Sequence, residues 1–378
     1  MIDQPFVPHV VFGLDPMAVS TAILLATYAA IIWDKLNRSI VALLGASLMI
    51  LVGVVDQAEA VRGIDWNTLG LLAGMMILVS ISRRSGMFQY VAIWSAQRAK
   101  ASPAGILLLL QLTTAVVSAL LDNVTTVLLI VPVTLVITSE LDVPPYPFLF
   151  AEVFASNIGG TATLIGDPPN ILIGSLAGLD FNAFILNLAP VVVVVMAAQA
   201  LIAHLVWGQA MRSTPTQRAR VMAMRPADAI LDPVLLKQAT AVLAVVILAF
   251  IFARQLGVAP ATVAMAGAAV LMFLDNWQHH NEKQSANVHK TFSDVEWITI
   301  FFFIGLFVIV QLWHLGAAAK SEVAYWCHFG GMLAGAILFP LMKPPEVRLF
   351  ECVRPIPDTV VRIGPKPARP ASRPDGFR

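Results

Sequence analysis

Long apolar segments separated by short polar ones run through most of this 378-residue chain. A helix needs about 20 consecutive apolar residues to cross the roughly 30 Å hydrocarbon core of a bilayer. Stretches of suitable length and composition lie at 17–33, 40–55, 69–82, 183–207, 238–255, 259–274, 297–313 and 322–342. Because backbone that faces lipid must satisfy its own hydrogen bonds, the pattern predicts an all-α polytopic membrane protein.

Composition narrows the class of protein further. Hydrophobic residues make up 58% of the chain and charged residues 12%, whereas soluble domains carry about 25% charged residues, so a soluble enzyme is excluded. The 24 Lys and Arg nearly cancel the 23 Asp and Glu; the expected partner is therefore the lipid bilayer and not nucleic acid. Cys327 and Cys352 lack metal-ligand spacing, and the histidine-containing loop Asp275–Lys290 is expected to be a solvated linker. No metal site is predicted, and no cofactor other than a bound sodium ion.

The basic residues predict the orientation in the membrane. None precedes Lys35, so the N-terminus lacks the positive region of a signal peptide and the first span should remain in the membrane. With the N-terminus outside, every Lys and Arg except Arg62, Arg254 and Lys320 falls on the inner side, as the positive-inside rule favours. We expect a multi-pass protein of the cell inner (plasma) membrane with a cytoplasmic tail. The amphipathic segment Met87–Lys100 is expected to lie along the interface.

The segment Gly105–Thr138 does not fit an ordinary span. As one helix it would be about 51 Å long at 1.5 Å per residue, which is too long for one crossing and too short for two. The bias of basic residues also requires this region to enter and leave on the inner side. Its centre is polar, from Ser118 to Thr126. We therefore expect a re-entrant hairpin over 105–138, with Asp122 and Asn123 at a tip that faces a water-filled or ion-filled cavity.

The next segment, Tyr146–Leu179, is interrupted by two glycines and then by Gly-Asp-Pro-Pro. Such a sequence cannot form a continuous helix, so two half-helices joined by an unwound loop are expected over 146–179. The prolines lack N–H donors and help to leave carbonyls free for a hard cation such as sodium, whereas half-helix N-termini suit an oxyanion. Glu152, in the first half-helix, is a candidate proton relay; the alternative is a hydrogen-bonded packing acid.

The two interrupted segments read SALLDNVTTVLLIVPVT from Ser118 and ASNIGGTATLIGDPPNILIGS from Ala155. Together they resemble the arsenite permease, sodium–proton antiporter and melanosomal P-protein group of the ion transporter (citrate transporter-like) superfamily, over about residues 17–312. The resemblance implies an inverted-repeat transporter fold with a re-entrant hairpin and a broken helix. It also implies a secondary active transporter, not an enzyme, that moves a small inorganic ion by arsenite or antimonite efflux or by sodium–proton exchange.

In that superfamily the hairpin tip and the unwound loop jointly build the ion and substrate site. Carried onto this chain, the resemblance implies the binding residues Ser118, Asp122, Asn123, Thr125, Thr126, Asn157, Gly159, Gly160, Thr161, Thr163, Asp167, Pro168, Pro169 and Asn170. Dicarboxylate-transporting relatives usually carry Thr where this chain has Asp167, and a carboxylate there suggests cation or proton handling. The sequence has no ATPase motif, so transport would be driven by a gradient or by a separate ATPase subunit.

An internal repeat links the two halves of the chain. Ile64–Val79 aligns without gaps on Val295–Val310, in the opposite expected orientation, as an inverted repeat demands. The matched pairs include Asp65 and Glu296, Trp66 and Trp297, Thr68 and Thr299, and Gly74 and Gly305. At the same spacing a second hairpin tip would fall at Val353, in a basic tail, so the second repeat is expected to be incomplete.

The domain organisation follows from these observations. The expected parts are a first transporter repeat at 1–208 that closes with the span 183–207, a cytoplasmic linker at 209–237, a truncated second repeat at 238–313, a last helix within 314–342 and a basic Pro-rich tail at 343–378. The alternative to a transporter is a transport-inactive, truncated or fused membrane protein. Its expected partner is a complete permease, and further copies of the chain in a homo-oligomer are the other expected protein partner.

The segment Glu322–Leu341 resembles the last membrane helix of rhomboid intramembrane proteases. His328, Gly331 and Gly335 take the places of its A-H-x-x-G-x-x-x-G pattern. Rhomboid catalysis also needs a serine in a G-x-S-G setting for the histidine to activate. The nearest sequence here is Arg83–Gly86, which lacks the first glycine. Protease activity is therefore rejected, and a protease remnant is the weakest alternative.

Overall fold

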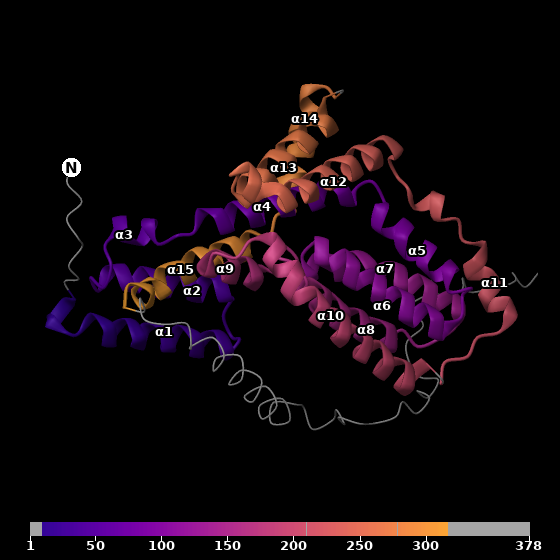
Figure 1. The fold of residues 1–378 in the computed structure, drawn as a ribbon, viewed down its shortest axis with the longest axis horizontal. Helices are drawn as coiled ribbons and strands as arrows, with labels where there is room; N and C mark the ends of the chain where they lie inside the picture. The colour runs from indigo at the N-terminus through magenta and orange to yellow at the C-terminus, as the bar shows by residue number, and fades with distance from the viewer. Residues whose placement is uncertain (1–9, 209, 278, 317–378) are drawn as a thin grey trace, which may run out of the picture. The chain divides into compact units, whose positions relative to one another are not determined.

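The computed structural model describes residues 10–208, 210–277 and 279–316, and all regular structure in these ranges is helical (Figure 1). The predicted all-α fold is confirmed. The α-helices are α1 Pro16–Ile32, α2 Arg38–Leu51, α3 Gln57–Arg62, α4 Trp66–Arg83, α5 Met87–Arg98, α6 Pro103–Leu120, α7 Asn123–Leu141, α8 Tyr146–Gly160, α9 Pro168–Ala177, α10 Phe181–Ala203, α11 Pro215–Ala223, α12 Pro233–Leu256, α13 Pro260–Asn276, α14 Asn281–Ser293 and α15 Trp297–Gly316.

Several of these helices suit a membrane. In the described part of the chain, α4, α6, α7, α12, and α10 extended to Gly208 are long and apolar enough to cross a bilayer. The helices α1, α2 and α13 are shorter and apolar, and α14 and α15 form a pair bent by 51°. The multi-pass membrane protein predicted from the apolar stretches is thus confirmed. The span 322–342, the rhomboid-like helix and the tail 343–378 lie outside the described residues.

Two polar segments are more ordered than their sequences suggest. The segment Asp275–Lys290, expected to be a solvated linker, is mostly exposed but is not irregular, because Asn281–Ser293 forms α14. The expected linker 209–237 contains α11, which a capping box between Thr214 and Gln217 begins. Short polar helices of this kind depend on caps and on contacts with neighbouring helices. Neither source of stability leaves a hydrophobic periodicity that sequence reasoning can detect.

The helices α4 and α15 begin with equivalent caps. The Thr68 hydroxyl donates to Asp65 Oδ2 at 2.6 Å before α4, and the Thr299 hydroxyl donates to Glu296 Oε2 at 3.0 Å before α15. Acidic side chains at a helix N-terminus offset the positive end of the helix dipole. Burial raises the pKa of Asp65, but hydrogen bonds from Ser175 and Thr68 outweigh it, so the pKa lies below its usual range. Asp65 is therefore held as a carboxylate.

The two aligned helices also pack reciprocally, since α4 packs on α13 and α15 packs on α2. A Cβ added to Gly74 would lie 2.7 Å from the backbone of Ala264, and one added to Gly305 would lie 2.6 Å from the backbone of Ala42. Small residues at such points let membrane helices approach closely. In chain order α2 lies two helices before α4, and α13 lies two helices before α15. Each aligned helix thus packs on the helix that precedes the other one, as two copies of one unit related by a twofold axis would do. The pattern supports the internal repeat, whose extent stays a prediction.

Two ion pairs join the C-terminal end of α4 to the segments that follow α12. Arg84 Nη2 lies 2.8 Å from Asp275 Oδ2 at the end of α13, and both side chains are largely buried. Arg83 Nη2 lies 2.9 Å from Asp294 Oδ2 after α14, in a more exposed position. Both pairs bridge residues about 200 positions apart (275 − 84 = 191 and 294 − 83 = 211). They therefore fix the first repeat region to the second at this end of α4.

The interrupted segments rest on these helices. Leu164, Ile165 and Ile171 lie in the same buried apolar cluster as one face of α4, and α9 packs on α4. On the other side of the interruption, α6 and α7 both pack on α8 (Figure 1). The interrupted region is thus enclosed by apolar packing on both sides, which holds its polar backbone in a defined geometry.

Candidate functional site

The expected hairpin consists of α6 and α7, joined by the two residues Leu121 and Asp122. Leu121 is the C-cap of α6, and Asp122 is the N-cap of α7, where its carboxylate accepts the backbone N–H of Thr125 at 2.8 Å. Its carbonyl accepts the Thr126 hydroxyl at 2.9 Å. A short acidic side chain at this position satisfies N–H groups that have no partner within the helix. Each arm is also long enough to cross a membrane, so the re-entrant insertion of the hairpin stays a prediction.

The expected broken helix consists of α8, a seven-residue loop from Thr161 to Asp167 (167 − 161 + 1 = 7), and α9. The Asn170 side chain closes this loop, because its amide nitrogen donates to Gly160 O at 3.2 Å and to Thr163 O at 2.9 Å. The backbone N–H of Gly166 donates to the Thr163 hydroxyl at 3.1 Å. These bonds hold the loop as a fixed turn, as a binding loop requires.

Side chains join the hairpin tip to the broken helix. Asn123 Nδ2 donates to Asn157 Oδ1 at 3.0 Å, and the Ser156 hydroxyl donates to Asn123 O at 2.7 Å. The Ser118 hydroxyl donates to Ser156 O at 2.7 Å, and the Thr163 hydroxyl donates to a carbonyl of α6. The two interruptions therefore form one polar site. Ser156 lies at its centre and was missed as a site residue, although it opens the polar sequence of the second motif.

Of the other predicted site residues, several serve the local backbone. Thr125 supplies an N–H to the cap and Thr126 is buried with its hydroxyl on α7. The Thr161 hydroxyl donates to Asn157 O at 2.9 Å. Pro168 and Pro169 are the first two residues of α9. These residues shape the site, whereas Asn123, Asn157 and the two acids present polar side-chain atoms to it.

Close backbone contact makes two glycines necessary here. A Cβ at Gly159 would overlap the backbone of Ala115. A Cβ at Gly166 would lie 2.5 Å from Gly160 O and 2.7 Å from Ser118 O. Real Cβ atoms do not approach carbonyl oxygens so closely, so the hairpin tip and the loop would have to separate. Gly166 is the missed member of this pair, and the signal for it is its place in Gly-Asp-Pro-Pro.

The variant Gly166→Ala is expected to lower the free energy of unfolding by about 1–3 kcal/mol, as overpacking of a filled interior does. The matched control is Gly70→Ala in α4, where the added Cβ meets only the Ala261 side chain at 3.1 Å. This control should cost less than Gly166→Ala, because its one close contact is with a side-chain atom and is partly offset by the roughly 1 kcal/mol that Ala gains over Gly in a helix. Thermal unfolding of the two purified variants in detergent measures the difference. Equal melting temperatures would contradict the close contact of tip and loop.

The electrostatics of the site favour positive charge. The C-terminal ends of α6 and α8 both meet there, and each carries roughly half a negative charge. Asp122 and Asp167 add two carboxylates, which interact electrostatically with each other. The Asp167 carboxylate makes no capping hydrogen bond with the described residues of α9. The sequence has no Lys, Arg or His between Lys100 and His204, so this region offers no cationic side chain to balance the acids.

The N-termini at the site are poor anion binders by comparison. Pro168 and Pro169 have no N–H, and the N–H of Asn170 is used by Asp167 O at 2.9 Å. At α7 the Asp122 carboxylate already occupies the N-terminus. An oxyanion needs free N–H groups at a helix N-terminus. The site is therefore built from acceptors, which suits a cation.

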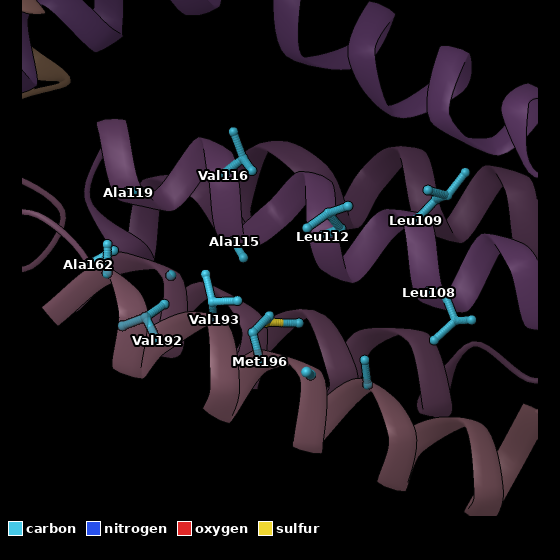
Figure 2. Close-up of a pocket in the computed structure, with 14 residues that line it drawn as sticks. Leu108, Leu109, Leu112, Ala115, Val116, Ala119, Ala162, Val192, Val193 and Met196 are labelled. Carbon is cyan, nitrogen blue, oxygen red and sulfur yellow. The ribbon is translucent and has the colours of Figure 1, made fainter. Parts of the chain in front are cut away.

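An apolar groove of about 490 Å³ lies beside the site, between α6 and α10 (Figure 2). Val193 and Met196 of α10 point toward Ala115 of α6, and Ala162 of the loop closes one end. All of its lining side chains are apolar. The groove therefore has no side chain that could bind an ion.

Comparison with known proteins gives similarities over most of the chain. The citrate transporter family matches residues 28–339. A 46 kDa membrane protein of Mycobacterium leprae is 41% identical over 309 residues, which cover 81% of this chain and 69% of that protein. An uncharacterized transporter of Mycobacterium tuberculosis is 45% identical over 310 residues, with the same two shares. The P protein of Homo sapiens is 43% identical over 178 residues, which cover 44% of this chain and 21% of the P protein.

These similarities confirm the predicted resemblance at the level of the citrate transporter-like superfamily and the P protein. They do not single out the arsenite permease or the sodium–proton antiporter subgroup. The family match continues through most of Glu322–Leu341, so the resemblance of that segment to rhomboid proteases is not confirmed.

Proposed function

The chain belongs to the citrate transporter family, and from this premise we propose that it is a secondary active transporter that exchanges sodium for protons. The observation that carries the proposal is the charge of the site at the hairpin tip and the broken helix. Two carboxylates and two helix C-termini meet there, and the first repeat region has no basic side chain between Lys100 and His204. A hard cation prefers such an oxygen-rich, negative site.

Citrate itself fits this half of the site poorly. A carboxylate substrate needs N–H donors or cationic side chains, yet the two prolines remove donors from α9 and Asp122 occupies the N-terminus of α7. Like charges brought together in a medium of low dielectric repel strongly. The acids of this site favour a cation as the transported ion.

The proposed exchange uses the residues as follows. Asp122 and Asp167 bind sodium together with carbonyl and side-chain oxygens of the loop and the tip, and Asn123 and Asn157 hold the tip against the broken helix. When sodium leaves, one of the two carboxylates takes up a proton, so one bound positive charge replaces another and the net charge of the site is the same in both states. Glu152, one turn before Ser156 on α8, relays protons when no cation is bound to it. Buried ionisable groups in membrane segments commonly have such roles.

The proposed setting is the plasma membrane, with the N-terminus outside and the inner side carrying the excess of Lys and Arg. That orientation places the loop between α7 and α8 and the end of α4 on the cytoplasmic side. A topology assay with reporter fusions after α10 and after α12 would check it, with the first fusion expected inside and the second outside.

Growth of a bacterial host that lacks its own sodium–proton antiporters and arsenite efflux pump tests the proposal. Expression of the full chain is expected to restore growth in high sodium or lithium at alkaline pH. Rescue on arsenite or antimonite alone would assign the other ion class implied by the resemblance. Uptake of labelled citrate would assign an anion instead. If the chain reaches the membrane and rescues neither condition, the transport-inactive alternative holds.

A further inference from the structure

The three helices α6, α7 and α8 enclose a second polar layer below the site at the hairpin tip. In the first layer, Ser156 of α8 contacts both Ser118 of α6 and the Asn123 carbonyl of α7. Glu152 lies four residues before Ser156 and Thr114 lies four before Ser118, so each is one helical turn further on the same face of its helix. The Thr134 hydroxyl of α7 donates to Glu152 Oε1 at 2.6 Å, which fixes Glu152 toward the interior of the three helices.

The relative direction of α6 and α8 brings the α6 residues to the level of Glu152. The early part of α6, with Leu107 and Leu110, shares a buried cluster with Phe148 and Ala151 of early α8. The later residues Ala115 and Ala155 share another. The two helices therefore run parallel, and a residue of α8 lies beside the residue of α6 that comes about 40 positions earlier in the sequence (155 − 115 = 40). At this spacing Gln111 and Thr114 of α6 lie opposite the turn of α8 that contains Glu152.

Three oxygens in this layer have no hydrogen-bond partner among the described residues: Glu152 Oε2, Thr114 Oγ1 and Gln111 Oε1. All three residues are completely buried, at 0% exposure. The amide nitrogen of Gln111 is fixed, because it donates to Leu107 O at 2.9 Å, and its oxygen is therefore the free atom. Each unpaired buried polar group costs on the order of 1–3 kcal/mol, and an unpaired carboxylate costs more. A ligand that contacted all three atoms would remove these costs together.

The chemistry of the three atoms selects the ligand. A carboxylate, a hydroxyl and an amide oxygen are all hard oxygen ligands, which favours a hard cation. One carboxylate carries one negative charge, so a monovalent cation leaves the layer neutral, whereas a divalent one would leave a buried positive charge. A protonated Glu152 together with a water molecule would satisfy the same atoms without an ion, and the sodium-binding measurement below distinguishes the two arrangements. We propose that Glu152, Gln111 and Thr114 bind a single sodium ion between α6, α7 and α8.

This sodium site is distinct from the site at the tip and the loop. One helical turn, about 5.4 Å along the axis, separates Glu152 from Ser156. The same serine belongs to the first layer, so occupancy of the lower site would rigidify the contact between hairpin and broken helix. The physiological role of the site rests on the proposed sodium–proton exchange, but the binding of sodium does not, and it can be measured without transport.

The test is the binding of radioactive sodium to the purified full chain in lipid nanodiscs, with potassium or choline as the balancing cation. The chain is expected to bind sodium, and Glu152→Gln is expected to lose the component at this site. The isosteric variants Thr114→Val and Gln111→Met should weaken sodium binding at this site by roughly tenfold or more, since even the loss of partners around the direct ligands lowers metal affinity on that scale. The matched control is Thr138→Val. That residue is also buried on α7, but its hydroxyl bonds only to Leu135 O of its own helix, so sodium binding should not change.

The variant Asp122→Asn distinguishes the two sites, because it changes the hairpin tip and should leave sodium binding at Glu152, Gln111 and Thr114 intact. Absence of sodium binding by the wild-type chain would overturn the proposal. So would unchanged binding in both Thr114→Val and Gln111→Met, or a single component that Asp122→Asn removes entirely. Sodium binding with the expected variant pattern in a chain that fails to exchange protons would uphold this site and refute the proposed transport.

Discussion

Replacing Asp122 with asparagine is expected to reduce sodium–proton exchange by about a hundredfold or more, the scale seen when a proton-transferring group is lost. The physical reason is that one of the two carboxylates at the site disappears, while the geometry does not. Asparagine caps a helix about as well as aspartate does, so it can still accept the N–H of Thr125 and leave α7 correctly begun. The initial rate of sodium-stimulated proton efflux from inverted membrane vesicles measures the effect.

The matched control is Asp180→Asn. Asp180 caps α10 through the same bond, since its carboxylate accepts the N–H of Ala183 at 2.8 Å, but it lies outside the hairpin tip and the loop. Its loss tests what a changed cap alone does to the rate. The exchange rate of this variant should match the wild type. A similar loss of rate in both variants would show that the effect of Asp122→Asn comes from helix capping and not from the charge of the site.

The second large effect is expected from Arg84→Ala, which should lower the free energy of unfolding by about 3 kcal/mol. The Asp275 carboxylate is only 9% exposed and its Arg84 partner 17% exposed, so removing the guanidinium leaves a nearly buried negative charge. Breaking one partner of a buried ion pair costs far more than the intact pair contributes. Thermal or chemical unfolding of the purified protein in detergent measures the change.

Two further variants make this prediction specific. The double variant Arg84→Ala with Asp275→Ala removes both charges and should be more stable than Arg84→Ala alone, as a double-mutant cycle would reveal. The exposed pair of Arg254 and Asp180, 3.7 Å apart, provides the control, because Arg254→Ala should change stability by less than about 1 kcal/mol. If Arg84→Ala and Arg254→Ala had the same small effect, the pair at the end of α4 would not hold the two regions together.

Much of the fold can be predicted from sequence because its signals are local. The apolar stretches up to residue 313 coincide with helices, and Pro168 and Pro169 begin α9 as their fixed backbone angles favour. The polar centre at Asp122 likewise separates α6 from α7. The helix α14 could not be predicted in this way, because its stability comes from contacts such as Gln284 Nε2 to Asn276 O at 3.2 Å. Such contacts are set by the tertiary arrangement.

The site residues differ in the same way: some are signalled by the local sequence, and others act through long-range contacts. Asp122, Asn123, Asn157 and Asn170 are unusual residues for a membrane segment and stand out in the sequence, and the structure connects Asn123 to Asn157 directly. The role of Ser156 depends on a carbonyl 33 positions away, and its place at the start of the polar sequence does not by itself reveal that contact. The unpaired oxygens of Gln111 and Thr114 are visible only once α6 and α8 are seen to run parallel. The role of Ser156 and the placement of these two oxygens both depend on how distant helices align with one another, which sequence spacing does not encode.

The most direct test of the account is sodium-driven proton movement by the purified full chain in proteoliposomes. Vesicles with an acidic interior and a trapped pH-sensitive dye are diluted into sodium chloride, or into choline chloride as the control. We expect a sodium-dependent rise of internal pH that wild-type vesicles show and Asp122→Asn vesicles lack. No sodium-dependent change in wild-type vesicles, or an equal change in both preparations, would contradict the claim that the carboxylates at the hairpin tip and the broken helix exchange sodium for protons.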